Sequence, residues 1–479
     1  MRALGLVAVP AVASIAALAW PKQATRPLLL PVAAFPHLLL ALWCLIDPGP
    51  PVPAAWLAMD VVARAVLPLV SLLFLVAALY AVAYLKLRAE RNNRIFVAAL
   101  LGMLALLSLA LQAQHLGLLW VAAEAATMVT VPLLHFNRSA RAYEATWKYL
   151  LVGGTGLALS LMGTFGLGYA SLQAGGAGDL TFLSLSQQVH SWSPPWLTLA
   201  WVLLLAGYGT KMGVAPMHTW KPDAYGEAPG IVGTMLAGGM TTMAFVAVLR
   251  VKAVVDRAMG PAMTTRTLLG LGLLSMALAA LFLLRTRDFK RLLAYSSVEH
   301  MGILAIGAAL GRAGTAAALF HVWTNGMTKG ALFFTAGNLR RIGGGRTADE
   351  VGGLRHVAPA SAALFVTGLF AVTACPPFGV FFSEIQILRA ALDSGRPAVA
   401  GGFVACLLVA FFGLTRLVFA IVDGEPKTVA PPRPELRDTL GVIGPPLACL
   451  LAALWLGLAP PQLLADTWRQ AAAWLGDVP

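Results

Sequence analysis

Charged residues are scarce in this sequence, where they make up 11% of the 479 residues, against about 25% in soluble domains. A soluble chain of this length needs a polar shell that so few charges cannot supply. Hydrophobic runs of about 18 residues or more instead recur along the chain, and each is long enough to cross a bilayer core of roughly 30 Å. The sequence therefore predicts an all-α integral membrane protein.

Cysteine is also rare, and the motifs of common cofactor sites are missing. The four cysteines are Cys44, Cys375, Cys406 and Cys449. They lie in or beside apolar runs and form no CxxC pair, which excludes the usual disulfide, iron–sulfur and zinc patterns. The chain has no GxGxxG after a strand, no Walker loop and no HExxH. We therefore expect no cofactor, no metal and no catalytic redox centre in this chain.

The net charge of +13 raises the question of a nucleic-acid partner. We expect none, because the basic residues fall in short loops between apolar runs, where they set topology and meet anionic lipid. Their bias places one set of loops in the cytoplasm and both termini outside, in a bacterial inner (plasma) membrane. The loop with Arg250, Lys252, Arg257 and Arg266 is the one clear violation.

We predict about fourteen transmembrane helices and no soluble domain. The first run, from about Ala3 to Trp20, is also compatible with a signal peptide, and topology alone does not exclude its cleavage. The predicted spans are 3–20, 27–46, 61–85, 95–113, 115–135, 146–171, 196–217, 229–250, 267–285, 292–311, 314–338, 356–388, 398–422 and 440–460.

Two of these spans contain helix-breaking residues beside a charge. In the seventh, Gly207, Gly209 and Gly213 lead to Pro216. In the twelfth, the pair Pro376–Pro377 and Gly379 interrupt the run. Broken helices at corresponding places in two halves are a sequence signal for an ion pathway, although a simple proline kink has the same appearance.

Several ionisable residues lie within the predicted spans, where a charge costs about 2.5–3.5 kcal/mol. Glu124 lies near the centre of its run, Lys211 precedes the first break and Glu384 follows the second. Lys329 has His321 two turns earlier on one helical face. Such groups predict a proton relay, because each hop needs a titratable partner nearby.

Other ionisable residues have a competing structural interpretation. Lys148 is either a snorkelling anchor or the cation that holds Glu124 ionised. His218, Glu299 and His300 lie close to predicted cytoplasmic ends and are weaker relay candidates. Lys221, Asp223 and Glu227 are expected to anchor a loop.

Five sequence strings carry a resemblance to a known family. They are ATWKYLLVGG, TKMGVAPMHTWKPDAYGEAP, DFKRLLAYSSVEHMGILAIG, MTKGALFFTAGNL and PPFGVFFSEIQIL, which together span roughly 115–390. The chain resembles the antiporter-like, proton-pumping membrane subunits of respiratory complex I and membrane-bound hydrogenases. The WKYL and SSVEHMG strings are most similar to the hydrogenase-4 component F type.

This resemblance implies a fold of fourteen helices with two inverted five-helix repeats and discontinuous helices 7 and 12. We expect helices 1–3 in residues 1–94, the first repeat in 95–250 and the second in 251–422. Helix 14 and a tail would fill 423–479. The resemblance also implies a relay through Glu124, Lys148, Lys211, His321, Lys329 and Glu384.

The sequence departs from the family pattern at four positions. Thr242 stands where some members have an eighth-helix lysine, and Asn325 stands where several have a second histidine. Lys221 replaces a usual leucine, and Tyr225 a usual histidine. These departures concern the central part of the relay.

Three functions fit these observations. The first is a proton-translocating subunit of a redox complex, with other membrane subunits and a peripheral redox arm as partners. The second is a subunit of a cation/proton antiporter or of a proton-coupled inorganic-carbon uptake complex, with no redox partner and with protons or Na⁺ as the ion. The third, a stand-alone solute transporter, is disfavoured because no solute-lining pattern is evident.

Overall fold

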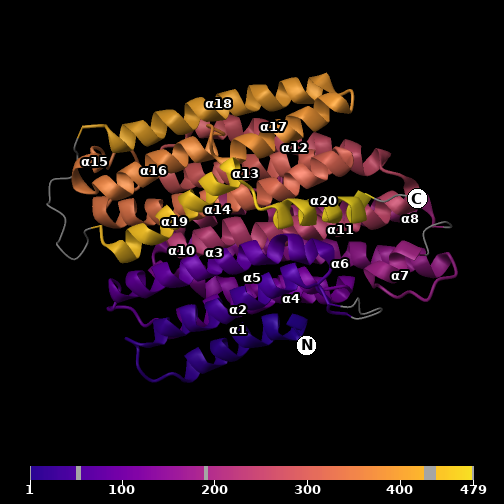
Figure 1. The fold of residues 1–479 in the computed structure, drawn as a ribbon, viewed down its shortest axis with the longest axis horizontal. Coiled ribbons are helices and arrows are strands. Elements are labelled where there is room, and N and C mark those ends of the chain that lie inside the picture. The colour runs from indigo at the N-terminus through magenta and orange to yellow at the C-terminus, as the bar shows by residue number, and fades with distance from the viewer. Residues whose placement is uncertain (1, 50–55, 188–191, 426–437, 477–479) are drawn as a thin grey trace.

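The protein is a bundle of roughly parallel helices in the computed structural model, which describes residues 2–49, 56–187, 192–425 and 438–476. Figure 1 shows most of the helices running along the long axis of the bundle. Within the described residues, β pairing is confined to three isolated bridges. The predicted all-α class is therefore confirmed.

The first half of the chain supplies the helices before and through the first interruption. They are α1 (Arg2–Ala19), α2 (Leu29–Ile46), α3 (Val61–Lys86), α4 (Arg94–Gln112), α5 (Leu116–Leu134), α6 (Ala140–Gln173), α7 (Phe182–Gln187), α8 (Pro194–Met212), α9 (Trp220–Glu227), α10 (Gly230–Met235) and α11 (Thr241–Met259). A π-helical turn, Leu236–Met240, joins α10 to α11.

The second half supplies the rest of the bundle. Its helices are α12 (Ala262–Arg285), α13 (Phe289–Ala309), α14 (Gly311–Gly343), α15 (Leu354–Val357), α16 (Pro359–Val372), α17 (Gly379–Asp393), α18 (Pro397–Val422), α19 (Leu440–Leu458) and α20 (Gln462–Gly476). In Figure 1 the two halves lie on opposite sides of a centre formed by α3, α11 and α14.

Eleven stretches of the described chain are long and apolar enough to cross a bilayer, which establishes a multi-pass membrane protein. They coincide with eleven of the fourteen predicted spans. The other three predicted spans are formed by α8, by α14 and by α16 with α17. α14 is polar because it carries His321, Asn325 and Lys329, while α16 and α17 are 14 and 15 residues long, shorter than a spanning helix needs.

The C-terminal tail differs from expectation, because it forms the amphipathic helix α20. Trp468 is 4% exposed, and its ring lies 5.1 Å from that of Phe320 in α14. The segment is too short and too polar for the span pattern. Its helix is stabilised by tertiary packing on α3 and α14.

Three of the four cations in the loop that violates the charge bias pair within the protein. Arg250, with a fully buried side chain, donates to Asp60 at 2.8 Å and to the carbonyl oxygen of Ala113. Lys252 pairs with Asp256, and Arg257 donates to Ser186 Oγ at 2.8 Å. Because these cations have protein partners at this end of the bundle, the positive-inside rule does not decide on which side of the membrane they lie.

Small residues let α6 and α8 approach closely. A Cβ built on Gly207 would lie 2.5 Å from the carbonyl oxygen of Gly156, and one on Gly163 would lie 2.7 Å from Leu204 Cγ. Such small-residue contacts are the usual basis of close helix packing in membranes. This contact fixes α8, and therefore Lys211 near its end, against α6.

We expect Gly207→Ala to lower stability by about 1–3 kcal/mol, because the new methyl group overpacks a backbone contact. Thermal melting in detergent should show a lower Tm. Gly154→Ala on α6 is the matched control, because a Cβ there meets nothing within 4 Å. Equal melting temperatures for the two variants would contradict the close α6–α8 contact.

Candidate functional site

The first helix interruption lies at the end of α8. α8 ends at Met212, and Gly213 adopts a left-handed φ of 79° that an L side chain rarely takes. The chain then turns through Pro216 into α9. Gly207 and Gly209, which were predicted to lead into the break, lie within α8, so the interruption itself begins at Gly213.

The second interruption separates α16 from α17, as the Pro376–Pro377 pair predicted. Helix α19 packs directly on it: a Cβ on Gly457 would lie 2.0 Å from the carbonyl oxygen of Pro377. A Cβ on Gly379 would lie 3.3 Å from the carbonyl oxygen of Ala453. The non-helical backbone is thus covered by protein, the condition under which it is tolerated at membrane depth.

Lys211 and Glu124 form the centre of the first half. Lys211 is 1% exposed, and its Nζ lies 3.3 Å from Tyr149 Oη and 4.6 Å from the centre of that ring. Glu124 on α5 interacts electrostatically with Lys211, and its Oε2 is buried without a protein hydrogen-bond partner. The structure therefore brings these two predicted relay residues together.

Lys148 has other partners. Its amine lies 2.6 Å from Glu144 and 2.8 Å from Asp223, and its side chain is 46% exposed. Asp223 also pairs with Arg291 of α13. These contacts favour the anchor interpretation of Lys148, and the pairing of Glu124 is with Lys211 instead.

The loop string around α9 is clamped by ion pairs, as expected for Asp223 and Glu227. Arg346 makes two hydrogen bonds to the carboxylate of Glu227, and Arg340 lies 3.7 Å from it. Lys290 donates to the carbonyl oxygen of Ala228. Helix α9 is therefore held against α6, α13 and α14, elements of both halves.

Lys221, the third residue of that loop prediction, points inward. Its side chain is 0% exposed, and Nζ donates to the carbonyl oxygen of Met212 at 2.8 Å. It also interacts electrostatically with Lys329. Sequence reasoning assigned Lys221 to the loop anchor and noted that it replaces a usual leucine, but did not name it as a relay residue.

Lys329 and Glu299 occupy the interface of α13 and α14. Lys329 is 0% exposed, and its Nζ donates to Ser296 Oγ at 2.6 Å. Glu299 is 3% exposed and interacts electrostatically with Lys329. The structure thus brings a weaker candidate, Glu299, beside a stronger one.

Two histidines form a hydrogen-bonded pair that ends beside Glu384. His300 Nδ1 lies 3.0 Å from His321 Nε2, and His321 Nδ1 lies 2.9 Å from Ser383 Oγ. Glu384 Oε1 lies 4.0 Å from His300 Nδ1, and neither carboxylate oxygen has a protein hydrogen-bond partner. Three helices, α13, α14 and α17, supply this group.

These three ionisable residues place possible ligand atoms within 4.8 Å of one another, so a metal ion must be considered. Two nitrogens bound to one tetrahedral zinc at about 2.0–2.1 Å lie roughly 3.3 Å apart. The two imidazole nitrogens here are 3.0 Å apart. That spacing fits a proton shared between the rings better than a metal.

His218 lies apart from the histidine pair, in an aromatic setting. Its ring lies 6.3 Å from Phe282 and 6.4 Å from Tyr295, and its Nδ1 is buried without a protein partner. It interacts electrostatically with Lys221. His218 therefore flanks the first break on the side of α12 and α13.

Buried polar atoms without protein partners are frequent among these groups. In the described residues they include Asn325 Oδ1, Thr328 Oγ1 and both carboxylate oxygens of Glu384. Buried polar groups are normally satisfied by protein or ordered water. We therefore expect ordered water beside these side chains of α14 and α17.

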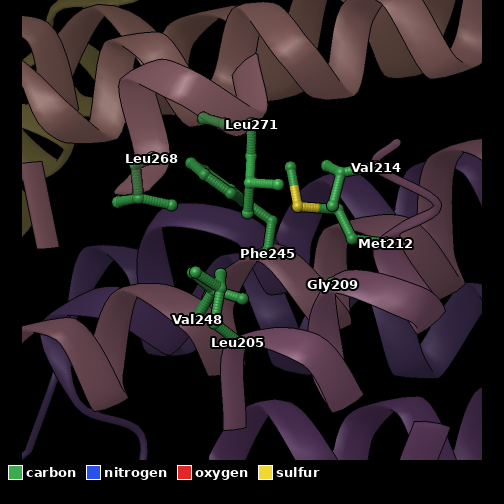
Figure 2. Close-up of a pocket in the computed structure, with 9 residues that line it drawn as sticks. Leu205, Gly209, Met212, Val214, Phe245, Val248, Leu268 and Leu271 are labelled. Atoms are coloured by element: carbon green, nitrogen blue, oxygen red, sulfur yellow. The ribbon is translucent and has the colours of Figure 1, made fainter. Parts of the chain in front are cut away.

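A small cavity beside the end of α8 has a different character. Figure 2 shows the labelled side chains converging on it from α8, the segment after it, α11 and α12. Its lining is apolar, so it lacks the polar partners that hold water and does not extend the polar group around Lys211. It is lined by Leu205, Gly209, Met212, Val214, Phe245, Val248, Leu268, Leu271 and Ala305.

Comparisons with known proteins match this arrangement over most of the chain. The family described as NADH:quinone oxidoreductase/Mrp antiporter, TM, matches residues 113–409. A hydrogenase-4 component F homolog of Methylacidiphilum infernorum is 34% identical over 339 residues, 70% of each chain. An NADH-quinone oxidoreductase subunit N of Desulforudis audaxviator is 30% identical and covers 88% of this chain and 86% of its own.

Solved structures share the fold at lower identity. A chain of the Mrp complex from Dietzia sp. DQ12-45-1b superposes with a TM-score of 0.86 at 22% identity, covering 99% of this chain and 98% of its own. A chain of Thermus thermophilus respiratory complex I gives 0.81 at 24% identity, covering 99% and 100%. An archaeal membrane-bound sulfane sulfur reductase chain gives 0.88 at 20%, covering 100% and 98%.

We expect Glu227→Ala to destabilise the protein by about 3 kcal/mol, because it removes the carboxylate that Arg346 and Arg340 share in a mostly buried site. Thermal melting of the purified protein measures the loss. Glu90→Ala is the control, since that side chain is 60% exposed in its pair with Arg88 and should matter little. A Glu227 variant that melts like the control would show that these pairs do not hold α9.

Proposed function

The chain belongs to the transmembrane family of NADH:quinone oxidoreductase and Mrp antiporter subunits, and we propose that it is a proton-translocating membrane subunit of a multi-subunit redox complex. One observation carries the proposal. Titratable groups run through both halves, from the half-buried Glu124 and the buried Lys211 to the buried Lys329, Glu299 and Glu384. Buried charges inside a membrane bundle are the usual mark of proton pathways.

The relay that we propose uses the predicted residues in the order of their interactions. Glu124 exchanges protons with Lys211, and Lys329 exchanges them with Glu299, each pair lying within electrostatic range. Glu299 in turn interacts with Glu384. The hydrogen-bonded pair of His300 and His321 supplies a second route, which ends 4.0 Å from the same carboxylate.

The energy for pumping comes, in this proposal, from partner subunits. A subunit that pumps must tie each proton hop to an outside energy source, since a charge moved across 100 mV requires about 2.3 kcal/mol. The relatives include a hydrogenase-4 component F homolog and an NADH-quinone oxidoreductase subunit N. We therefore propose other membrane subunits and a peripheral redox arm as partners.

A second function has a specific observation in its favour. The chain superposes closely on part of an Mrp complex, so a subunit of a cation/proton antiporter, with Na⁺ as a further ion, is the alternative. A proton-coupled inorganic-carbon uptake complex belongs to the same alternative, because it too lacks a redox partner. Purification in mild detergent followed by mass spectrometry of the attached subunits separates the two functions.

We also propose that fourteen segments cross the membrane. The eleven apolar stretches supply eleven of these segments. In this proposal α8, α14 and the α16–α17 pair supply the other three, and their polar or interrupted character matches their place at the relay. The two interruptions support two inverted five-helix repeats in 95–250 and 251–422. Residues 1–94 and 423–479 flank the repeats in this division.

The proposed orientation has both termini outside a bacterial inner membrane. We expect alkaline phosphatase fused after α20 to be active, and the same enzyme fused after α14 to be inactive, because the latter end carries Arg340, Arg341 and Arg346. Enzyme activity in intact cells is the measurement. Activity of the second fusion but not the first would reverse the topology.

We expect Glu124→Gln, Lys211→Ala and Glu384→Ala each to lower proton translocation about a hundredfold, because each removes a proton-transfer group. The intact complex in proteoliposomes, driven by its electron donor, is monitored with a pH-sensitive dye while turnover is recorded. Assembly should be unchanged.

Each matched control makes the same kind of substitution at a residue outside the relay. Glu144→Gln replaces a carboxylate that is 64% exposed, and Lys290→Gln replaces a buried amine that binds a backbone carbonyl. Both should pump in proportion to the assembled complex. Normal pumping by all three relay variants would contradict the proposed function.

A further inference from the structure

Lys221 occupies a place that the relay described above leaves open. In the first half, Glu124 of α5 interacts with Lys211 of α8. The group of the second half begins at Lys329 of α14. No hydrogen bond or ion pair between described side chains joins Lys211 to Lys329 directly. Lys221 on α9 lies at the junction, since α9 packs against both α6 and α13.

The hydrogen bond of Lys221 ties it to the first half. Its Nζ binds the carbonyl oxygen of Met212, the residue that follows Lys211. Gly213 provides the room: a Cβ there would lie 2.6 Å from Lys221 Cδ and 2.9 Å from Nζ. The left-handed φ of Gly213 and the missing side chain are thus both needed for the amine to reach the end of α8.

The electrostatic contacts of Lys221 extend to the second half. It interacts electrostatically with Lys329, His300 and His218. The ring of Tyr225 lies 5.7 Å from its Nζ, and Tyr225 interacts with Ser297 of α13. The amine is therefore surrounded by titratable groups of α13, α14 and the turn before α9.

A purely structural role explains only part of this arrangement. A lysine at the C-terminal end of a helix stabilises the last carbonyl groups through its fixed charge. Here, however, a second buried lysine lies within electrostatic range, and repulsion between the two ammonium groups favours states in which one amine is neutral. A pair that shares its charge in this way can pass a proton from one amine to the other.

We propose that Lys221 carries protons between the two halves of the chain, accepting them from the Lys211 side and donating them to Lys329. The step forms an N–H bond on the neutral amine of Lys221 and breaks one on the donor ammonium. The reverse exchange with Lys329 restores the neutral amine. This inference rests on the proposed function, because it adds a residue to the same relay.

The test compares Lys221 variants that separate hydrogen bonding to the Met212 carbonyl from proton exchange. Lys221→Gln keeps an N–H donor for the Met212 carbonyl but cannot exchange a proton, and Lys221→Arg keeps both the donor and a permanent charge. Each intact complex is reconstituted in proteoliposomes. Protons moved per turnover are measured with a pH-sensitive dye, together with the amount of complex assembled.

We expect both variants to assemble and to move at least about tenfold fewer protons per turnover. Lys290→Gln, which also removes a buried amine from a backbone carbonyl, should pump normally. Normal proton yield in either Lys221 variant would overturn the proposal. Failure of both variants to assemble would make Lys221 a structural cap and would overturn it equally.

Lys211→Ala, measured in parallel, separates this inference from the proposed function. If Lys211→Ala stops pumping while Lys221→Gln does not, only the role of Lys221 is wrong. If both pump normally, the proposed relay is wrong as a whole. Loss of pumping in both, with Lys290→Gln intact, supports the two together.

Discussion

The burial of lysine amines inside a membrane bundle is the constraint on which the rest of the structure depends. Lys211, Lys221 and Lys329 are each at most 1% exposed, and an uncompensated charge in such a place is costly. Each amine has a polar partner: Tyr149 Oη, the Met212 carbonyl oxygen and Ser296 Oγ. One of these partners exists only because α8 is interrupted, since an uninterrupted helix would use the Met212 carbonyl in its own ladder.

The interruption also explains the loop that follows it. An unwound segment at this depth has to be covered and held by protein, and α9 is held by pairs from Asp223 to Lys148 and Arg291, and by Glu227 with Arg346. These clamps come from α6, α13 and the loop after α14, so they fix α9 to both halves at once. The ion pairs that hold α9 and the buried amines within the bundle therefore both depend on the interruption of α8.

The sequence predicted the helical class, both interruptions and the burial of most relay candidates, because the cost of a charge in an apolar run is a local signal. It could not predict the direction in which side chains point from a loop or a helix end. Lys148 was interpreted as either an anchor or the partner of Glu124, and its contacts with Glu144 and Asp223 favour the anchor. Lys221 anchors the loop through the Met212 carbonyl, as expected, but its inward direction was not predicted. The helix α20 was missed because its stability comes from Trp468 packing on α14, which no local pattern records.

The central claim is that the buried titratable groups of both halves exchange protons along one continuous polar line. A cryo-EM map of the intact complex, at a resolution that shows ordered water, tests it most directly. The account predicts water or direct hydrogen bonds joining Glu124, Lys211, Lys221, Lys329, Glu299 and Glu384 without a gap wider than one water molecule can bridge. Dry apolar packing between Lys211 and Lys329 in every state of the complex would contradict it.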